Sequence, residues 1–349
     1  MENQTNTVEK KITPSQIMQV GVGFFASKTL LTAVKLELFT HLSLCPLSGE
    51  EIKGKLGLQS RGLYDFLDTL VSLSFLNREG LRDEAFYSNT EETDLFLDKS
   101  KPSYIGGILE MANNRLYKFW DNLDDALITG QPQNEIKHTG VSLFDELYKD
   151  SQKLREFMMA MQGAQMGAFI ELASQFNFKK YNTLCDIGGA SAALSIQVAQ
   201  KNPHMKCISA DLPVVRAIAQ ENIERFKLQG NVSTVNLDFF EESEFPKSDV
   251  ITMGNILHDW GLHDKKMLMK KAYNALPEGG ALVIVENVID NDRSKNTFGL
   301  LMSLNMLIET LEGFDFTASD FEGWAKGIGF SKVEMMPLAG PTSAVIAIK

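Results

Sequence analysis

The stretch NILHDWGLHD, residues 255–264, holds two histidines and two aspartates, residue types that bind metals or move protons. His258 and His263 are five residues apart, whereas two ligands on one helix face need a spacing of three or four, so we expect no metal site. His258 follows a predicted strand, at the sheet edge where α/β enzymes place their sites, and is therefore a candidate general base. His263 and Asp264 begin the next predicted helix and are interpreted as structural.

A second group of polar residues follows the strands of a predicted βαβ unit. Residues 186–189 (DIGG) end one strand in a glycine turn, and Asp211 closes the next strand, an arrangement typical of nucleoside binding. The run GGASAA would crowd a diphosphate, which favours S-adenosylmethionine over a dinucleotide. Asp238 and Phe239 follow a third strand and could hold an adenine. A glycine turn needed only for packing, and a loop acid beside core phenylalanines, are the alternatives.

The elements that must position these residues alternate between strands and helices after Tyr181. The predicted strands are TLCDI, KCISA, VSTVN, DVITMG and ALVIVE, with helices between them. This alternation predicts an α/β fold with a mostly parallel sheet, helices on both faces, and ligands at the carboxyl ends of the strands. The final pair, VEMMPL and SAVIAIK, predicts an antiparallel hairpin at the sheet edge.

The residues before the sheet predict a helical region. Residues 14–42 are apolar nearly all round a helix, which leaves a face that a second chain could cover. Residues 41–98 predict a winged-helix pattern with a capping box at Ser48 and Glu51. Five basic and eleven acidic residues give this segment a charge of −6, so we expect dimerisation and no DNA binding. The predicted domains are a dimerisation domain (1–100), connecting helices that line the substrate pocket (101–176) and a cofactor-binding catalytic domain (177–349).

The composition of the 349 residues is that of a globular protein, with 44% hydrophobic and 23% charged residues. A formal net charge of −11 argues against nucleic acid or an anionic membrane surface as partner. MENQTNTVEKK is unlike a signal peptide, and no uninterrupted apolar run reaches about 18 residues, so we expect a cytoplasmic protein without a membrane span. Cys45, Cys185 and Cys207 have neither disulfide nor zinc spacing.

The ordered motifs LCDIGGASAAL, ISADLPVV, LDFFEESEFPKSDVI, NILHDW, NALPEGGALVIVENVI and DFEGWAKGIGF resemble one family along essentially the whole chain. This family is that of the S-adenosylmethionine-dependent O-methyltransferases of the plant caffeate and animal hydroxyindole type. Its members have a Rossmann-like class I methyltransferase domain and an N-terminal dimerisation region, and the resemblance implies the same two domains here. The resemblance implies S-adenosylmethionine as cofactor and S-adenosylhomocysteine as product. It makes His258 the general base, with Glu286 beside it. It also implies cofactor contacts from Asp186, Gly188, Gly189, Asp211, Leu212, Asp238, Phe239, Gly254 and Trp260.

Three features depart from the family pattern. Ala190 and Ala192 stand where further glycines are usual, which leaves the backbone path of the turn open. Gly254 replaces a lysine that often lies four residues before the histidine, which removes one cofactor contact. Asp315, in the segment GFDFT, replaces the glutamate of a GxExT motif as the third expected catalytic group, one methylene shorter.

We therefore expect a homodimeric enzyme of secondary metabolism that methylates a hydroxyl of a small aromatic metabolite. A phenolic hydroxyl is the first expectation. A phenol has a pKa of about 10 and imidazole about 6.5, so complete proton transfer would cost about 5 kcal/mol and removal must accompany attack. The alternatives are a same-fold enzyme that methylates nitrogen or carbon or catalyses another reaction, and a ligand-binding regulator. The candidates for the substrate pocket are Trp120, Phe157, Met161, Met302 and Asn305.

Overall fold

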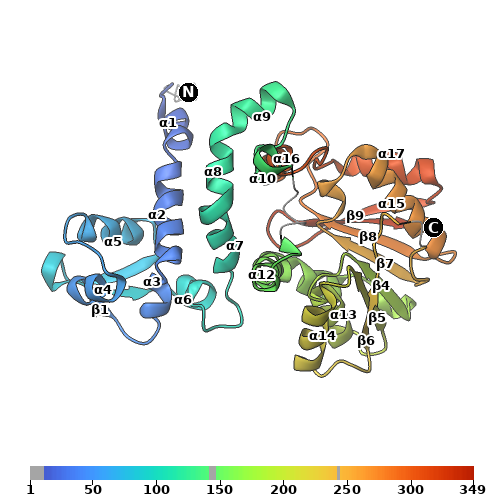
Figure 1. Ribbon diagram of the computed structural model, residues 1–349, viewed down its shortest axis with the longest axis horizontal. Coiled ribbons are helices and arrows are strands. Elements are labelled where there is room, and N and C mark those ends of the chain that lie inside the picture. Colours follow the sequence, from blue (N-terminus) through green and yellow to red (C-terminus); the bar gives the residue numbers. More distant parts are fainter. Residues whose placement is uncertain (1–11, 141–146, 242–243) are drawn as a thin grey trace, which may run out of the picture. The chain divides into compact units, whose positions relative to one another are not determined.

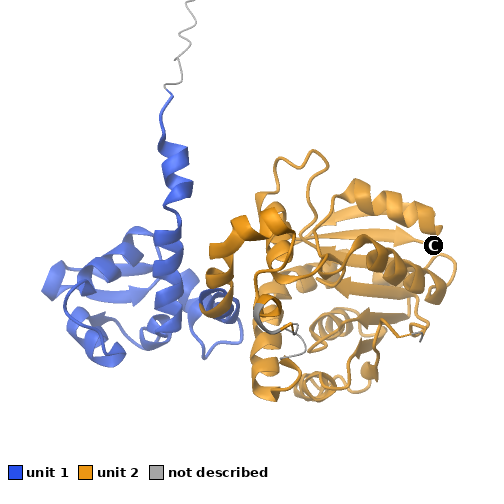
Figure 2. Cartoon of the chain, turned by 45° about the horizontal axis from the view of Figure 1, so that its top comes forward, with its two compact units in different colours: residues 1–113 blue, residues 114–349 orange. Residues whose placement is uncertain are grey.

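The computed structural model describes residues 12–140, 147–241 and 244–349. It comprises two compact units, Met1–Asn113 and Asn114–Lys349 (Figures 1 and 2).

The first unit consists of helices and a small antiparallel sheet in the order β1–β3–β2. Its helices are α1 (Ser15–Gly21), α2 (Phe24–Lys35), α3 (Leu38–His41), α4 (Gly49–Leu56), α5 (Leu63–Ser72), α6 (Glu91–Leu97) and α7 (Gly106–Met111). Its strands are β1 (Leu47–Ser48), β2 (Leu76–Glu79) and β3 (Phe86–Asn89). The predicted capping box is present, because Ser48 accepts from the backbone N–H of Glu51 while the Glu51 carboxylate accepts from that of Ser48. The predicted hairpin is closed by a longer loop that contains the 3₁₀ turn Arg82–Glu84.

The apolar segment of residues 14–42 forms three helices, α1, α2 and α3, and much of its apolar surface is uncovered within one chain. Ile17 and Val20 are each 76% exposed, and Phe25 is 61% exposed. By length and composition alone, Ser15–Lys35 also qualifies as a helix that could cross a membrane, a weak criterion that a covered helix of a water-soluble protein passes too. The expectation of no membrane span stays a prediction.

The second unit is built on a seven-stranded sheet in the order β6–β5–β4–β7–β8–β10–β9. The strands are β4 (Thr183–Ile187), β5 (Lys206–Asp211), β6 (Val232–Asn236), β7 (Val250–Gly254), β8 (Ala281–Glu286), β9 (Lys332–Pro337) and β10 (Ser343–Ile348). The first five strands in this order pair in parallel, while β10 pairs antiparallel with both β8 and β9. The mostly parallel sheet with an antiparallel edge hairpin is therefore confirmed.

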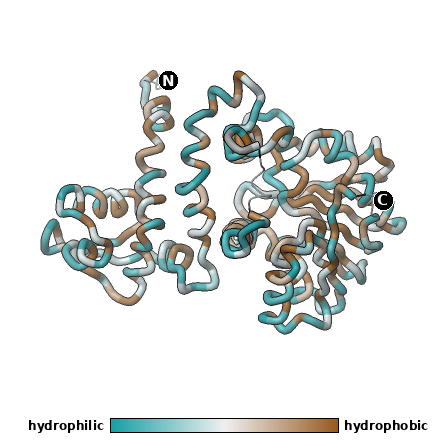
Figure 3. Tube along the Cα trace, in the orientation of Figure 1, coloured by the Kyte–Doolittle hydropathy of each residue, from teal (hydrophilic) through white to brown (hydrophobic). Residues whose placement is uncertain are grey.

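Helices cover both faces of this sheet. One core packs α12 (Ser151–Gln175), α13 (Ala193–Lys201) and α14 (Arg216–Arg225), and the other packs α15 (Leu262–Ala275) and α17 (Ala318–Ile328). Every residue of β8 is buried, as its unbroken apolar run ALVIV requires of a central strand. The hydropathy of the chain is coloured along its trace in Figure 3, where the strands of the sheet are largely hydrophobic. The unit also contains α8 (Tyr117–Phe119), η3 (Trp120–Asn122), α9 (Leu123–Thr129), α10 (Glu135–Thr139), η4 (Phe178–Lys180), η5 (Leu257–Asp259) and α16 (Thr297–Glu309), and the π-helical segment Ala112–Leu116 precedes them.

Candidate active site

The carboxyl ends of four adjacent strands bring the predicted site residues to one edge of the sheet. Asp186 lies in β4, Asp211 ends β5, Gly254 ends β7 and Glu286 ends β8, and these strands are neighbours in the order β5–β4–β7–β8. Parallel strands necessarily present their carboxyl ends together, so residues 100 positions apart in the chain meet here. The location expected from the sequence is thus the one the fold provides.

The turn after β4 approaches the loop that carries His258. Gly188 has a φ of 69°, and a Cβ at this position would overlap the side chain of Ile256, two residues before His258. A Cβ on Gly189 would overlap the Ser209 hydroxyl. Both glycines therefore allow these side chains to pack against bare backbone, and the left-handed backbone of Gly188 also favours glycine.

The two alanines that depart from the family pattern have a backbone conformation that glycine adopts more readily. Ala190 has a φ of 46° and Ala192 a φ of 62°, both in the left-handed region that disfavours a side chain. Ala190 stays in place because its N–H donates to Asp211 Oδ2 at 2.8 Å. The turn therefore stores backbone strain of about 1 to 2 kcal/mol at each alanine.

Ala190→Gly is expected to stabilise the protein. Glycine relieves the left-handed strain, and this gain in free energy exceeds the cost of the extra conformational entropy of glycine in the unfolded chain. The free energy of unfolding should therefore rise by about 0.5 to 1 kcal/mol. Thermal unfolding would show this as a rise in Tm of roughly 1 to 3 °C. Ala217→Gly, at an exposed helical position in α14, is the matched control and should lower the Tm. A Tm that falls in both variants would contradict the strain.

The two acids beside the turn differ in their surroundings. Asp186 is 3% exposed and accepts from the Thr252 hydroxyl at 2.7 Å, and burial raises its pKa to about 7 while the hydroxyl lowers it. Burial also raises the pKa of Asp211, while the N–H groups of Ala190 and Leu212 lower it; the Leu212 N–H lies 2.7 Å from Oδ1. Asp211 is only partly buried, so its carboxylate can accept further hydrogen bonds from a ligand.

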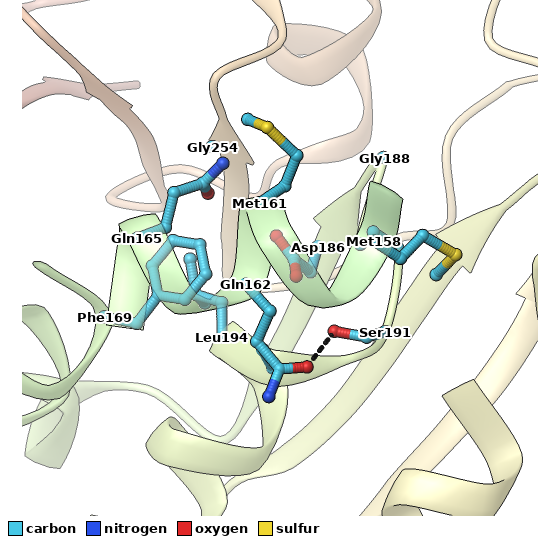
Figure 4. A pocket seen from close by; sticks show the side chains of 13 residues that line it. Met158, Met161, Gln162, Gln165, Phe169, Asp186, Gly188, Ser191, Leu194 and Gly254 are labelled. Carbon is cyan, nitrogen blue, oxygen red and sulfur yellow. Dashed lines mark hydrogen bonds between the residues drawn. The ribbon is translucent and has the colours of Figure 1, made fainter. Parts of the chain in front are cut away.

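A pocket of about 400 Å³, partly open to solvent, lies over the glycine turn (Figure 4). One of its walls is the turn itself, and the opposite wall is α12. The Ser191 hydroxyl donates to Gln162 Oε1 at 2.7 Å and joins the two walls. The residues that line the pocket are Met158, Met161, Gln162, Gln165, Phe169, Asp186, Gly188, Gly189, Ala190, Ser191, Ala193, Leu194 and Gly254.

The sequence analysis did not predict most of the α12 residues that line this pocket. Of these five residues only Met161 was predicted, and for the substrate pocket, whereas it lies with the glycine turn. The space beside Gly254 is occupied by Phe169 and Gln165, whose atoms would lie 3.3 and 3.5 Å from a Cβ at this position. The signal in the sequence was the spacing of 158, 161, 162, 165 and 169, which places all five on one helix face, with two glutamines among apolar residues.

The third acid and the aromatic residues form a neighbouring group. The Leu237 N–H donates to the carbonyl of Asp211, which places Asp238 beside the end of β5. The Asp238 carboxylate accepts from the Phe240 N–H at 2.9 Å. The rings of Phe239 and Phe240 lie edge to face with Trp260, at centroid distances of 5.9 and 4.5 Å. None of these residues lines the pocket over the glycine turn, so their contact with a cofactor stays a prediction.

His258 lies in η5, is 5% exposed, and is surrounded by three carboxylates. Its Nδ1 is 3.5 Å from Glu286 Oε2 and 3.5 Å from Asp315 Oδ1, and its Nε2 is 3.5 Å from Asp259 Oδ1. The His258 backbone N–H donates to Glu286 Oε1 at 3.3 Å. The structure thus brings together the three residues predicted as catalytic, and the shorter Asp315 reaches the histidine.

The electrostatics of this cluster favour a charged imidazole. Burial lowers the pKa of His258, but Glu286, Asp259 and Asp315 outweigh it and raise the pKa from 6.5 to about 10. Burial raises the pKa of Glu286, and the imidazolium opposes that rise. Nδ1 of His258, Oε2 of Glu286 and both carboxylate oxygens of Asp315 are buried without a hydrogen-bond partner, so small movements can form these bonds.

The same three side chains each place one ligand-type atom within 4.8 Å of the others. A cation could use such a set. His263, which the sequence analysis considered with His258 as a possible metal ligand, is exposed and is not part of the set. The expectation of no metal stays a prediction.

The substrate-pocket candidates fall into two groups. Trp120 in η3 donates from Nε1 to Asn305 Oδ1 at 2.9 Å, and Met302 lies on the same helix, α16, as Asn305. Phe157 and Met161 lie on α12, where Phe157 packs in a cluster that also contains Met158 and Ala190 of the pocket. The structure pairs Trp120 with Asn305, and a substrate role for any of the five residues stays a prediction.

Comparisons with known proteins match both units. Residues 120–331 match the family model of the O-methyltransferase domain, and residues 18–99 that of the O-methyltransferase dimerisation domain. The tetracenomycin polyketide synthesis 8-O-methyl transferase TcmO of Streptomyces glaucescens is 34% identical over 96% of this chain and 97% of its own. The N,N-dimethyltransferase OxyT of Streptomyces rimosus is 30% identical over 78% of each chain. The crystal structure of human N-acetylserotonin methyltransferase in complex with SAM superposes with a TM-score of 0.88 and 25% identity, covering 98% of this chain and 99% of that one.

Proposed function

Because the chain belongs to the O-methyltransferase family, whose cofactor is S-adenosylmethionine, we propose that it methylates a phenolic hydroxyl of a small aromatic metabolite with His258 as general base. The observation that carries this proposal is the position of His258. It lies in the loop after β7, packed through Ile256 against the glycine turn, with Glu286 and Asp315 at its Nδ1. S-adenosylhomocysteine would be the product.

The pocket over the glycine turn suits the amino-acid end of the cofactor. Bare backbone at Gly188 and Gly189 allows close approach, and no basic side chain for a phosphate is among the described lining residues. Asp186 would bind the amino-acid end, Asp211 with its free acceptor capacity the ribose, and Asp238 and Phe239 the adenine. The remaining predicted contacts are those of Leu212, Gly254 and Trp260. When bound, S-adenosylmethionine supplies an electrophilic methyl group on a sulfonium.

The carboxylates around His258 match the base to its task. A phenol with a pKa of about 10 would lose its proton uphill to an ordinary imidazole, by about 5 kcal/mol. The raised pKa of His258 makes this transfer less uphill, and it also means that the imidazolium must give up its own proton before the base can act. Glu286 and Asp315 hold the Nδ1–H and offset the imidazolium charge as Nε2 takes the proton. The positive charge of the bound cofactor favours the neutral imidazole needed at the start of the reaction.

The pH dependence follows from the sign of the His258 shift. Because protonated His258 cannot act as base, kcat/KM for the cofactor, which reports on the free enzyme, should rise with pH and have its midpoint between 6.5 and about 10. The raised pKa also stabilises the fold fully below pH 6.5, and this contribution is lost as the pH rises through about 10. Initial rates measured from pH 6 to pH 10 test this; a profile that is flat or falls over this range would contradict it.

The experiment for the function itself is transfer of labelled methyl from S-adenosylmethionine to a panel of phenols, hydroxyindoles, catechols and amines. We expect label on oxygen of at least one phenolic compound, at the same rate with and without EDTA because no metal is required. Label only on non-phenolic acceptors would overturn the phenolic assignment, and a rate restored by added Mg²⁺ after chelation would overturn the metal-free mechanism.

Methylation of an amine is the second candidate, because the similar protein OxyT is an N,N-dimethyltransferase. A neutral amine attacks without first losing a proton, so His258 would then matter little. NMR of the methylated product separates the two, since it identifies the methylated atom directly.

We further propose that the enzyme is a homodimer held by its first unit, which matches the dimerisation model. Phe25→Glu places a charge in the exposed apolar face of α1 and α2 and should shift the mass in light scattering towards one chain. Leu44→Glu, at a 93% exposed position outside these helices, is the control and should leave the mass unchanged. A Phe25→Glu protein of dimer mass would place the interface elsewhere. A cytoplasmic location without nucleic-acid or membrane partners stays a prediction.

A further inference from the structure

Lys265 is a buried cation that the proposed mechanism has not used. It lies in the first turns of α15 and is 0% exposed. Its ammonium donates to the carbonyl of Trp260 and lies 3.7 Å from the centroid of the Phe314 ring. Trp260 is two residues after His258, and Phe314 directly precedes Asp315. One side chain therefore contacts both segments that set the distance between His258 and Asp315.

The charge of Lys265 belongs to the same cluster. Burial lowers its pKa to about 8, while Glu286, Asp315 and Asp259 raise it, so the ammonium lies within electrostatic reach of all three acids. A buried ammonium costs several kcal/mol unless such partners compensate it. With His258 neutral, three carboxylates and one ammonium leave a net charge of −2; without the lysine it would be −3.

The carboxylates that face His258, and the ammonium that interacts with those carboxylates, come from several elements. Asp259 lies on its own turn, Glu286 on β8, Asp315 in the segment before α17, and Lys265 on α15. On α16, which contacts the same turn, Glu309 is paired with Arg115. Lys265 is thus the single cation, among the described residues around this turn, that counters the carboxylates.

We propose that Lys265 is a positioning residue for His258, which fixes the spacing of the 257–260 and 313–315 segments and offsets carboxylate charge so that the imidazole can release its proton. The inference rests on the proposed base role of His258. Lys265 itself contacts Trp260 and Phe314, and it acts through His258.

The first test is Lys265→Met, which keeps the length of the side chain and removes its charge. With more uncompensated negative charge around it, His258 should hold its proton more tightly. The kcat at pH 7.5 should therefore fall by about tenfold or more, and the midpoint of the pH–rate profile should move to higher pH. KM for S-adenosylmethionine should change little. Lys266→Met, at the exposed neighbouring position, is the matched control and should behave as wild type. An unshifted profile with wild-type kcat in Lys265→Met would overturn the proposal.

Two further variants separate this inference from the proposed function. In a His258→Gln background Lys265→Met should cause no further loss, and an equal loss there would show that the lysine does not act through His258. Full activity of His258→Gln would instead overturn the base assignment.

Phe314→Leu keeps every charge and removes the ring under the ammonium, so it tests the contact even if Lys265→Met does not fold. It should shift the profile in the same direction by a smaller amount, and an unchanged profile would count against the proposal.

Discussion

His258→Gln is expected to lower kcat by about 10²- to 10⁴-fold, the usual contribution of a positioned general base. Glutamine keeps a polar side chain of similar size but cannot accept a proton, so cofactor binding should be preserved. Single-turnover methyl transfer at several pH values measures the loss, and titration calorimetry with S-adenosylhomocysteine checks the binding. The variant should also lose the rise of rate with pH.

His263→Gln is the matched control for this experiment. It lies five residues away at the start of α15, is exposed, and is absent from the carboxylate cluster, so its rates should stay within about twofold of wild type. A His258→Gln enzyme that keeps the wild-type rate on a phenol would mean that proximity alone accelerates the reaction, and the general-base mechanism would have to be abandoned.

Gly313→Ala is expected to have the second largest effect, although this residue is not among the predicted site residues. A Cβ there would lie 2.6 Å from the carbonyl oxygen of His258 and 2.8 Å from that of Asp259, and would overlap the Thr310 hydroxyl. Backbone must move, and a displacement of about 1 Å at the base lowers kcat by about 10²-fold. The overpacking should also lower the free energy of unfolding by about 1 to 3 kcal/mol.

Gly323→Ala provides the comparison, because no atom lies within 4 Å of a Cβ at this position in α17. It should leave kcat unchanged and raise the free energy of unfolding by about 0.5 to 1 kcal/mol. Thermal unfolding and methyl-transfer rates of both variants give the contrast. Equal kcat values in the two variants would show that the segment before Asp315 does not position His258.

The sequence predicted the residues that a strand or a turn places, because the geometry of a parallel sheet leaves few alternatives. Asp186 and Asp211 follow from where strands end and His258 from the loop between β7 and α15, whereas Glu286 was implied by the family resemblance. Residues that reach the site through tertiary packing were out of reach. Gln162 and Gln165 come from α12, a helix before the sheet, and a sequence pattern does not fix which face of that helix meets the turn.

Ala190 and Lys265 show the same limit from the other side. The absence of glycine at Ala190 left the path of the turn open, yet the structure keeps a left-handed backbone there because the Asp211 carboxylate binds its N–H. A tertiary hydrogen bond overrode the local preference. Lys265 reads in sequence as a surface lysine of an amphipathic helix, and only the arrangement of three acids around it explains its burial.

The antiparallel strand β10 completes the pairing of β8, the strand that ends in Glu286. β8, which ends in Glu286, has β7 on one side and β10 on the other, with Ser343 opposite Glu286. Until residues 343–348 have left the ribosome, β8 is an edge strand with unpaired backbone groups, and the histidine loop has no fixed carboxylate against which to order. We therefore expect the nascent chain to form the glycine turn and the ends of β4 and β5 before Glu286 is fixed beside His258.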